Sequence, residues 1–263
     1  MEYEGRLGLA LGGGAALGWA HVGVLTALEE AGVRPDALTG TSSGALVAAL
    51  YAFDVSPARM EELLGWPRWK DLTDVTLSSL GLFSNRAVVE PLEEELGDAR
   101  IEDARMPLAV VASDINTGER VVLREGALLP ALRASACLPG LYTPVEIDGR
   151  TLVDGGVVDN VPVRVLSRLG ADVRVGVTLG ERVEFERVRT LVGVLVNAFL
   201  MAVHTGANHE LERHADVVVK PDLGGFHYWQ LAAREEIRER GRDAGRRAVE
   251  PVRAALRRAG GAG

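Results

Sequence analysis

Apolar and polar residues follow two different spacings along this chain. Short apolar runs bounded by turn residues predict strands, and longer segments with apolar residues at helical spacing predict helices. Because the two kinds of segment alternate, we expect the α/β class, as a three-layer α/β/α sandwich with a mostly parallel central sheet. Strands are predicted at Arg6–Leu11, Ala37–Gly40, Leu108–Ser113, Val121–Leu123, Thr151–Val153, Val173–Leu179 and Asp216–Val219.

Several helical segments carry end signals. Gly32 is placed to end the first helix, Ser56 to cap the third, and Asn116-Thr117-Gly118 to form a hairpin turn between two strands. The apolar stretch Leu191–Val203 is too short to span a bilayer and predicts a buried helix. Helices are predicted at about Gly18–Glu30, Ser43–Phe53, Pro57–Leu64, Ala87–Leu96, Gly126–Ser135, Pro162–Leu169, Phe185–His214 and from Leu231 onward, where Pro251 is expected to interrupt the last one.

Length and composition limit the class of protein. The 263 residues are 47% apolar, which suits one large core, so we expect a single domain at residues 1–259 and a flexible tail at 260–263. A net charge of −8 without a basic stripe argues against nucleic acid as a partner. Cys137 is the only cysteine, which excludes disulfides within the chain and favours a reducing compartment. The start of the chain lacks a signal-peptide pattern, so a cytoplasmic location is expected.

Gly40-Thr41-Ser42-Ser43-Gly44 lies between a predicted strand and a predicted helix. In a nucleophile elbow, a serine stands on a tight strand-to-helix turn, and glycines two residues away on either side prevent clashes with that turn. Ser42 is therefore the candidate nucleophile. A plain turn is the alternative, because G-x-S-x-G also occurs by chance in loops rich in glycine and serine.

Gly12-Gly13-Gly14 follows the first predicted strand and leads into the first predicted helix. Such a loop presents backbone N–H groups to an anion at the positive end of a helix. A dinucleotide fingerprint would need glycine in place of Leu17, and a phosphate loop would need a Gly-Lys-Ser/Thr ending that is absent. An oxyanion hole needs only a few N–H donors, and a tight turn remains the structural alternative.

Asp154-Gly155-Gly156 follows another short apolar run. A carboxylate at the end of a strand lies where open α/β sheets place their sites, although an Asp-Gly pair is also common in ordinary turns. The combination with Ser42 favours a catalytic role for Asp154. Asp159 is a rival carboxylate, which is more simply explained as a helix cap.

Together these motifs make the chain resemble the patatin-like phospholipase family over nearly its whole length. Ala112–Gly118 and Arg133–Gly140 are also similar to segments of bacterial members. The resemblance implies a Ser–Asp dyad without histidine: Ser42 attacks the acyl carbonyl of a lipid ester, Asp154 takes its proton, and water hydrolyses the acyl-enzyme. It also implies an oxyanion hole at Gly12, Gly13 and Gly14, and no metal or organic cofactor.

One position departs from the family pattern. The glycine loop usually carries arginine or lysine just before its last glycine, and Leu17 stands there instead. An oxyanion hole made of backbone N–H donors does not require the charge of that arginine or lysine. The departure favours neutral or soluble esters over charged phospholipids, and it leaves a lipid-sensing regulatory protein of low activity as an alternative.

A Ser-His-Asp triad is the alternative within enzymes, and His227 is its best base. His204, His209 and His214 fall at different angles around one helix, and His21 belongs to the core stripe of another. No histidine spacing indicates a metal site. A dyad without histidine needs a more basic aspartate than usual, which burial of Asp154 would supply.

Three segments are candidates for contact with substrate or membrane. Gly65–Trp69, followed by Leu80–Phe83, is aromatic and could form a lid, or simply cover the core. Leu191–Val203 could form a wall for an acyl chain, by resemblance to the family, or be a plain core helix. The arginine-rich last helix is better explained as docked with a solvated charged face than as a membrane-surface helix.

Overall fold

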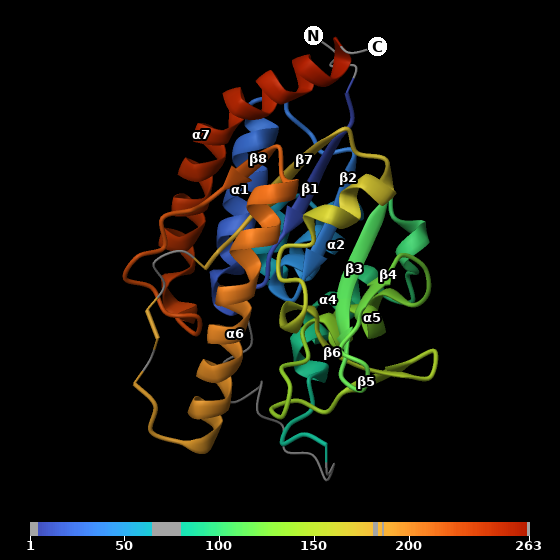
Figure 1. Ribbon diagram of the computed structural model, residues 1–263, viewed down its shortest axis with the longest axis vertical. Coiled ribbons are helices and arrows are strands. Elements are labelled where there is room, and N and C mark those ends of the chain that lie inside the picture. Colours follow the sequence, from blue (N-terminus) through green and yellow to red (C-terminus); the bar gives the residue numbers. More distant parts are fainter. Residues whose placement is uncertain (1–4, 65–79, 181–183, 186, 262–263) are drawn as a thin grey trace.

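The computed structural model describes residues 5–64, 80–180, 184–185 and 187–261. Within them, eight strands form one sheet in the order β5-β6-β3-β2-β1-β7-β8, and β4 also pairs with β3. Four of its strand pairings are parallel and three, all involving β3 or β6, are antiparallel. Helices flank this central sheet (Figure 1), so the predicted α/β class with a mostly parallel sheet is confirmed.

The strands agree closely with the predictions, apart from β5, which the sequence analysis missed. They are β1 (Leu7–Leu11), β2 (Ala37–Thr41), β3 (Leu108–Asp114), β4 (Arg120–Leu123), β5 (Val145–Ile147), β6 (Arg150–Asp154), β7 (Val173–Val177) and β8 (Val217–Val219). Because β5 has three residues and half-exposed side chains, its apolar signal is weak.

The helices also follow the predicted segments, with two corrections. The helix predicted at Phe185–His214 begins only at Leu191, where the Thr190 side chain caps it, and the segment predicted at Pro162–Leu169 is a 3₁₀ helix. The helices are α1 (Trp19–Glu30), α2 (Ser43–Ala52), α3 (Pro57–Leu63), α4 (Arg86–Leu96), α5 (Leu128–Ser135), α6 (Leu191–His214) and α7 (Arg234–Gly260), with 3₁₀ segments η1 (Ala15–Gly18), η3 (Ile101–Asp103), η4 (Gly155–Val157), η5 (Val163–Leu169) and η6 (Leu231–Ala233). Gly32, with φ +70°, follows α1, and the Ser56 side chain caps α3 by accepting the Arg59 N–H, as predicted. The α7 helix reaches Gly260, the first residue of the predicted tail.

The two faces of the sheet differ in the size of their side chains. On β1, Leu7, Leu9 and Leu11 belong to the larger core with α1, α2 and α7, whereas Ala10 belongs to a second core with η5. A Cβ on Gly8 would lie 2.6 Å from the Ala171 Cβ, so small residues on this face allow the chain around η5 to approach closely. Alternation along each strand therefore builds both outer layers.

The last helix is docked along the first, at the left edge of the molecule in Figure 1. A Cβ on Gly23 would lie 2.0 Å from the Arg238 carbonyl oxygen, and a Cβ on Gly241 would lie 2.0 Å from the Ala20 carbonyl oxygen. Glycine therefore lets the two backbones touch. The expectation that Pro251 interrupts this helix was wrong, because α7 continues through Pro251 on this packed surface.

Two strands meet end to end beside β3. The strand β4 pairs with residues of β3 that also pair with β2 and with residues of β3 that also pair with β6. Because β4 occupies one side of β3, both β2 and β6 must lie on its other side. Thr41, the last residue of β2, pairs with Val111, and Asp154, the last residue of β6, pairs with Ala112. Since β2 is parallel and β6 antiparallel to β3, their carboxyl ends face one another. This arrangement brings the residue after Thr41 next to Asp154.

The helix α6 is only partly buried, which corrects the prediction of a buried helix. Val196, Leu200 and Val203 are buried, whereas Leu191 and Met201 are exposed. Apolar spacing cannot distinguish the two faces here, because residues 191–203 are apolar on almost every side. Among the described residues, no helix has the combined length and apolarity that crossing a bilayer requires.

Candidate active site

The turn after β2 holds Ser42 in a strained conformation. Its φ of +54° and ψ of −127° lie where residues other than glycine are uncommon, and the side chain is half-buried at the start of α2. A Cβ on Gly40 would lie 2.5 Å from the Gly44 carbonyl oxygen, and one on Gly44 would lie 2.2 Å from the Leu11 carbonyl oxygen. Both glycines of the motif are therefore required sterically, and the turn has the geometry of a nucleophile elbow.

Ser135 fixes the backbone of this elbow, a contact that the sequence analysis missed. The Ser42 N–H donates to Ser135 Oγ at 2.9 Å, and the Ser135 hydroxyl donates to the Val111 carbonyl at 2.6 Å. Ser135 is buried at the end of α5, so its hydroxyl connects the elbow to β3. The only sequence signal was its place within Arg133–Gly140, because helical spacing does not reveal what a buried serine contacts.

Asp154 is buried at the end of β6. Its Oδ1 accepts the Gly156 N–H at 2.8 Å, while Oδ2 has no partner of full hydrogen-bond geometry among the described residues. Burial raises the pKa of Asp154 to about 7, although the Gly156 N–H and a loose hydrogen bond from Ser42 favour the charged form. The carboxylate is therefore a far stronger base than an exposed aspartate, and Oδ2 is free to take a proton.

The glycine after Asp154 is required by the meeting of β2 and β6. A Cβ on Gly155 would lie 2.3 Å from the Val111 carbonyl oxygen.

Asp159, the rival carboxylate, forms an ion pair with Arg120 at 2.5 Å instead of capping a helix. Its backbone carbonyl accepts the Thr41 hydroxyl at 3.0 Å, which ties this turn to the end of β2.

The N–H groups of the glycine loop have different partners. The Gly12 N–H donates to the Val177 carbonyl at 3.0 Å, and the Gly13 N–H donates to Asn160 Oδ1 at 3.0 Å. Neither the Gly14 N–H nor the Ala15 N–H has an acceptor in the described part of the chain. Of the three predicted donors, Gly14 alone keeps a free N–H here, with Ala15 beside it, because the first two hold the loop against β7 and Asn160.

Asn160 is a second contact that the sequence analysis missed. It lies on the turn that follows Asp154, is nearly buried, and reaches across to the glycine loop. A Cβ on Gly156 would lie 3.0 Å from Asp154 Oδ1 and 3.3 Å from Asn160 Oδ1. The side chain therefore sets the spacing between the loop that bears the free N–H groups and the turn that bears the carboxylate.

His21 also holds the glycine loop. Its Nε2 lies 2.7 Å from the Gly12 carbonyl oxygen, and burial lowers its pKa to about 4, so the ring is neutral. Because a carbonyl only accepts, Nε2 carries the proton, and the buried Nδ1 has no partner among the described residues. The expected core histidine thus orients the Gly12 peptide through Nε2.

An apolar pocket opens at Ser42. Aliphatic and aromatic side chains from six segments surround the serine, and no histidine takes part in the described lining. The lining residues are Ala15, Ser42, Ser43, Leu46, Val88, Ala136, Leu138, Tyr142, Phe199, Leu200 and Trp229. Phe199 and Leu200 come from the stretch predicted as an acyl wall, whereas the lid candidate Gly65–Trp69 lies outside the described residues.

His227 is directed elsewhere. Its Nδ1 lies 3.3 Å from the Glu184 carbonyl oxygen, although its neighbours Tyr228 and Trp229 reach the glycine loop and the pocket. The side chains of His204 and His209 are outside the described residues, and His214 lies at the end of α6. The geometry around Ser42 therefore offers a carboxylate, and none of the described histidines, as a proton acceptor.

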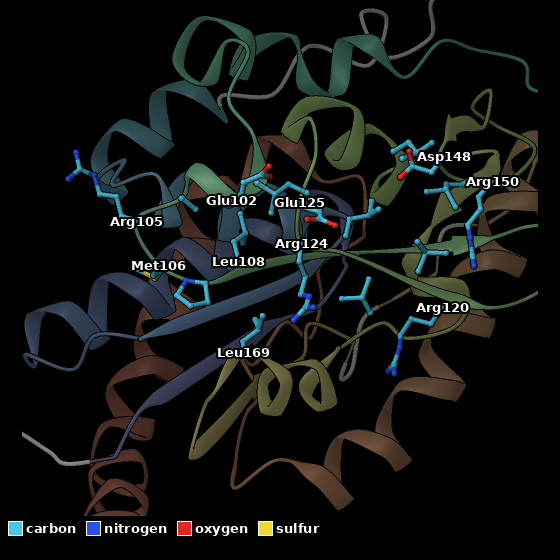
Figure 2. Close-up of a pocket in the computed structure, with 18 residues that line it drawn as sticks. Glu102, Arg105, Met106, Leu108, Arg120, Arg124, Glu125, Asp148, Arg150 and Leu169 are labelled. Atoms are coloured by element: carbon cyan, nitrogen blue, oxygen red, sulfur yellow. The ribbon is translucent and has the colours of Figure 1, made fainter.

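A wider groove of about 850 Å³ runs along β4 and contains neither Ser42 nor Asp154. Figure 2 shows its mixed lining, with Glu102 and Glu125 beside Arg124, and Arg120 at one end. Alternating charges make this groove unsuitable for an acyl chain.

Among the described residues no group of three or more His, Cys, Asp or Glu could hold a metal ion. The thiol of Cys137 is buried, and burial raises its pKa to about 12.

The family model for "Patatin-like phospholipase" matches residues 9–167, more than half of the chain. The chain belongs to the patatin-like phospholipase family. An uncharacterized NTE family protein of Mycobacterium tuberculosis is 35% identical over 182 residues, which are 66% of this chain and 49% of that protein. Human patatin-like phospholipase domain-containing protein 6 is 34% identical over 68% of this chain, but only 14% of that protein is covered. The chain thus spans about half, or much less, of these relatives.

Two further similarities fit this patatin-like assignment. The lysophospholipase nte1 of Emericella nidulans is 36% identical over 66% of this chain and 12% of that protein. The crystal structure of VipD from Legionella pneumophila superposes with a TM-score of 0.65 at 14% identity, covering 94% of this chain and 67% of that one. The second similarity concerns the fold alone.

The departure at Leu17 has a structural basis in this family member. Leu17 is fully buried in the larger core, among side chains of α1 and α2. The position therefore contributes packing instead of a charge beside the glycine loop, and the described lining of the Ser42 pocket contains no cation.

Replacing Asn160 by alanine is expected to lower kcat for ester hydrolysis about 10- to 100-fold with little change in KM, since the loop and the carboxylate would lose their relative placement. The buried Gly13 N–H would lose its better acceptor, at a cost of about 1–3 kcal/mol in unfolding free energy. Steady-state kinetics and denaturant unfolding measure both. Asn116→Ala, in the exposed hairpin turn, is the control, and equal kinetics for the two variants would contradict the positioning role.

Proposed function

We propose that this chain is a serine hydrolase that cleaves carboxylic acyl esters of lipids, of the phospholipase A or lysophospholipase type. The observation that carries the proposal is the meeting of β2 and β6, which brings the Ser42 elbow, in the wall of an apolar pocket, next to the end of β6 that carries the buried Asp154. The family match, and the similarity to relatives such as the fungal lysophospholipase nte1, support the substrate class.

In the first half of the proposed reaction, Ser42 Oγ attacks the acyl carbonyl and its proton passes to Asp154 Oδ2. A general base is most effective when its pKa lies near the working pH, and burial raises that of Asp154 to about 7. The negative oxygen of the tetrahedral intermediate is held by the glycine loop Gly12–Gly14, where the free Gly14 N–H donates and the other two glycines fix the loop's shape.

The intermediate collapses when Asp154 returns the proton to the departing alcohol, which leaves the acyl group esterified to Ser42. Water then attacks this ester, Asp154 takes a proton from the water, and Ser42 receives that proton as the fatty acid leaves. During both steps the apolar side chains around Ser42 contact the part of the acyl chain next to the carbonyl. No metal ion or organic cofactor takes part in these proposed reaction steps.

Covalent labelling by a fluorophosphonate probe tests this proposal. The probe phosphonylates an activated serine, so we expect peptide mass spectrometry to find the label on Ser42 of the wild-type chain. Hydrolysis of p-nitrophenyl esters of graded length should accompany it and report the acyl preference. An unlabelled protein that is inactive on every ester would overturn the hydrolase in favour of a regulatory lipid-binding protein.

A further inference from the structure

Large apolar side chains are exposed at eleven positions of the described chain, and ten of them fall in three segments, residues 80–82, 157–158 and 185–201. We call these ten side chains the apolar rim. They are Leu80, Leu82, Val157, Val158, Phe185, Val188, Leu191, Val194, Leu195 and Met201. Scattered exposed apolar residues are normal on protein surfaces, but such a concentration indicates a contact surface.

Two of these segments border the Ser42 pocket, and the third, residues 157–158, lies against α6. The helix α6 carries rim residues on its exposed face and lines the pocket with Phe199 and Leu200. The Leu82 N–H donates to the Leu141 carbonyl at 3.0 Å, beside Tyr142 of the pocket wall. Val157 and Val158 follow Asp154 and share a cleft with Ala202 and Val203 of α6.

The rim segments also approach one another. A Cβ on Gly140 would lie 3.9 Å from Leu195 Cδ1, so α6 meets the loop that pairs with residues 82–83. In Figure 1 the first turns of α6 and the segment leading into α4 both lie at the lower end of the molecule. The exposed apolar surface is therefore continuous with the pocket that contains Ser42.

The charges around the rim indicate what it contacts. Residues 191–203 contain no charged side chain, and the described charged residues just before them are Glu184, Arg187 and Arg189, which carry both signs. The net charge of −8 opposes an anionic bilayer. A protein partner would need about one hydrogen bond per 100–200 Å² of interface, whereas Asn197 is the only polar side chain of residues 191–203.

We propose that the apolar rim inserts into a zwitterionic lipid surface, such as a phosphatidylcholine bilayer, and presents the Ser42 pocket to its acyl esters. The proposal rests on the proposed function for the reaction at Ser42, but the docking itself depends only on the rim. Insertion buries exposed apolar area, and the acyl chain passes from the lipid to the pocket without crossing water.

Flotation with phosphatidylcholine vesicles tests the docking. Leu191 and Met201, which are 73% and 56% exposed, do not line the Ser42 pocket, so Leu191→Glu/Met201→Glu should fold normally. The double variant is expected to lower the vesicle-bound fraction at least about tenfold, because two inserted side chains are lost. Ile115→Glu removes the one large apolar side chain that is exposed outside the rim in the described part of the chain, at 48% exposure, and should bind like wild type.

Turnover of p-nitrophenyl butyrate, a soluble monomeric ester, separates this proposal from the enzymatic one. All three proteins should hydrolyse it equally, whereas the double variant should lose activity on vesicle-borne lysophosphatidylcholine. If none of the three proteins hydrolyses the soluble ester while wild type still floats with the vesicles, the proposed enzymatic function is rejected and the docking proposal is retained. The docking is overturned if wild type fails to float, if it floats only with anionic lipid, or if sedimentation shows a dimer that the double variant dissociates.

Discussion

Ser42→Ala is expected to reduce hydrolysis of p-nitrophenyl esters by at least about 10⁴-fold, because the proposed mechanism has no other nucleophile. Ser43→Ala is the matched control. Ser43 is the next residue, lines the same pocket, and its buried hydroxyl has no partner in the described part of the chain. We expect this control to keep most of the activity. Steady-state kinetics of the three proteins decide the identity of the nucleophile.

A second substitution at the same position separates catalysis from strain. Ser42→Gly should be as inactive as Ser42→Ala but more stable by about 1–2 kcal/mol, because glycine adopts a φ of +54° without strain. Thermal unfolding measures the difference. His227→Ala should leave turnover nearly unchanged, whereas its inactivation would restore the Ser-His-Asp triad. Activity remaining in Ser42→Ala would reject the dyad altogether.

Asp154→Asn is expected to lower kcat about 10²- to 10⁴-fold, because asparagine cannot accept the Ser42 proton. In wild type, activity should rise with pH and level off above about 7, the pKa to which burial raises Asp154, since only the carboxylate acts as a base. A pH profile of kcat/KM for a soluble ester measures this. A wild-type profile that levels off near pH 4 would contradict the buried base.

The same substitution should stabilise the protein at neutral and higher pH. Burial raises the pKa of Asp154 from an ordinary 3.8 to about 7, so the folded state binds this proton more tightly than the unfolded state does. Wild-type stability from this group is therefore greatest below pH 4 and falls as the pH rises to 7, by up to about 4 kcal/mol. Asp154→Asn has no such loss. Denaturant unfolding at pH 4 and pH 8 should show a gain for the variant only at pH 8.

Local residue patterns were sufficient to predict most elements and to mark Ser42 and Asp154, which the structure brings close together. The strand from Leu7 to Leu11 alternates large and small apolar residues, and such alternation depends only on which side chains face a core. The Gly40–Gly44 turn could be predicted from its motif, and the clash that requires Gly40 is with Gly44 and Ala45 of the same turn. The contacts that require Gly44 and Gly155 are with Leu11 and Val111 of other strands, so the motifs marked these glycines without revealing their partners.

The contacts between distant segments could not be predicted in this way. Ser135 and Asn160 act on residues 93 and 147 positions away, and nothing in their own helix or turn marks those partners. The glycine loop was predicted as three donors, but neighbours from β7 and the turn after Asp154 occupy two of them. The helix α6 was predicted to be buried, because composition does not reveal that nothing in the described chain covers its outer face.

The sequence by itself therefore determined the alternating α/β layers and marked the serine turn and the aspartate with its glycines, since alternation and motif spacing are local properties of the chain. The tertiary structure alone decided that β2 and β6 end against one another, that burial raises the pKa of Asp154 to about 7, and that one face of α6 remains exposed beside the pocket. Those features depend on which segments pack together, and hydrophobic spacing specifies a face without specifying its partner.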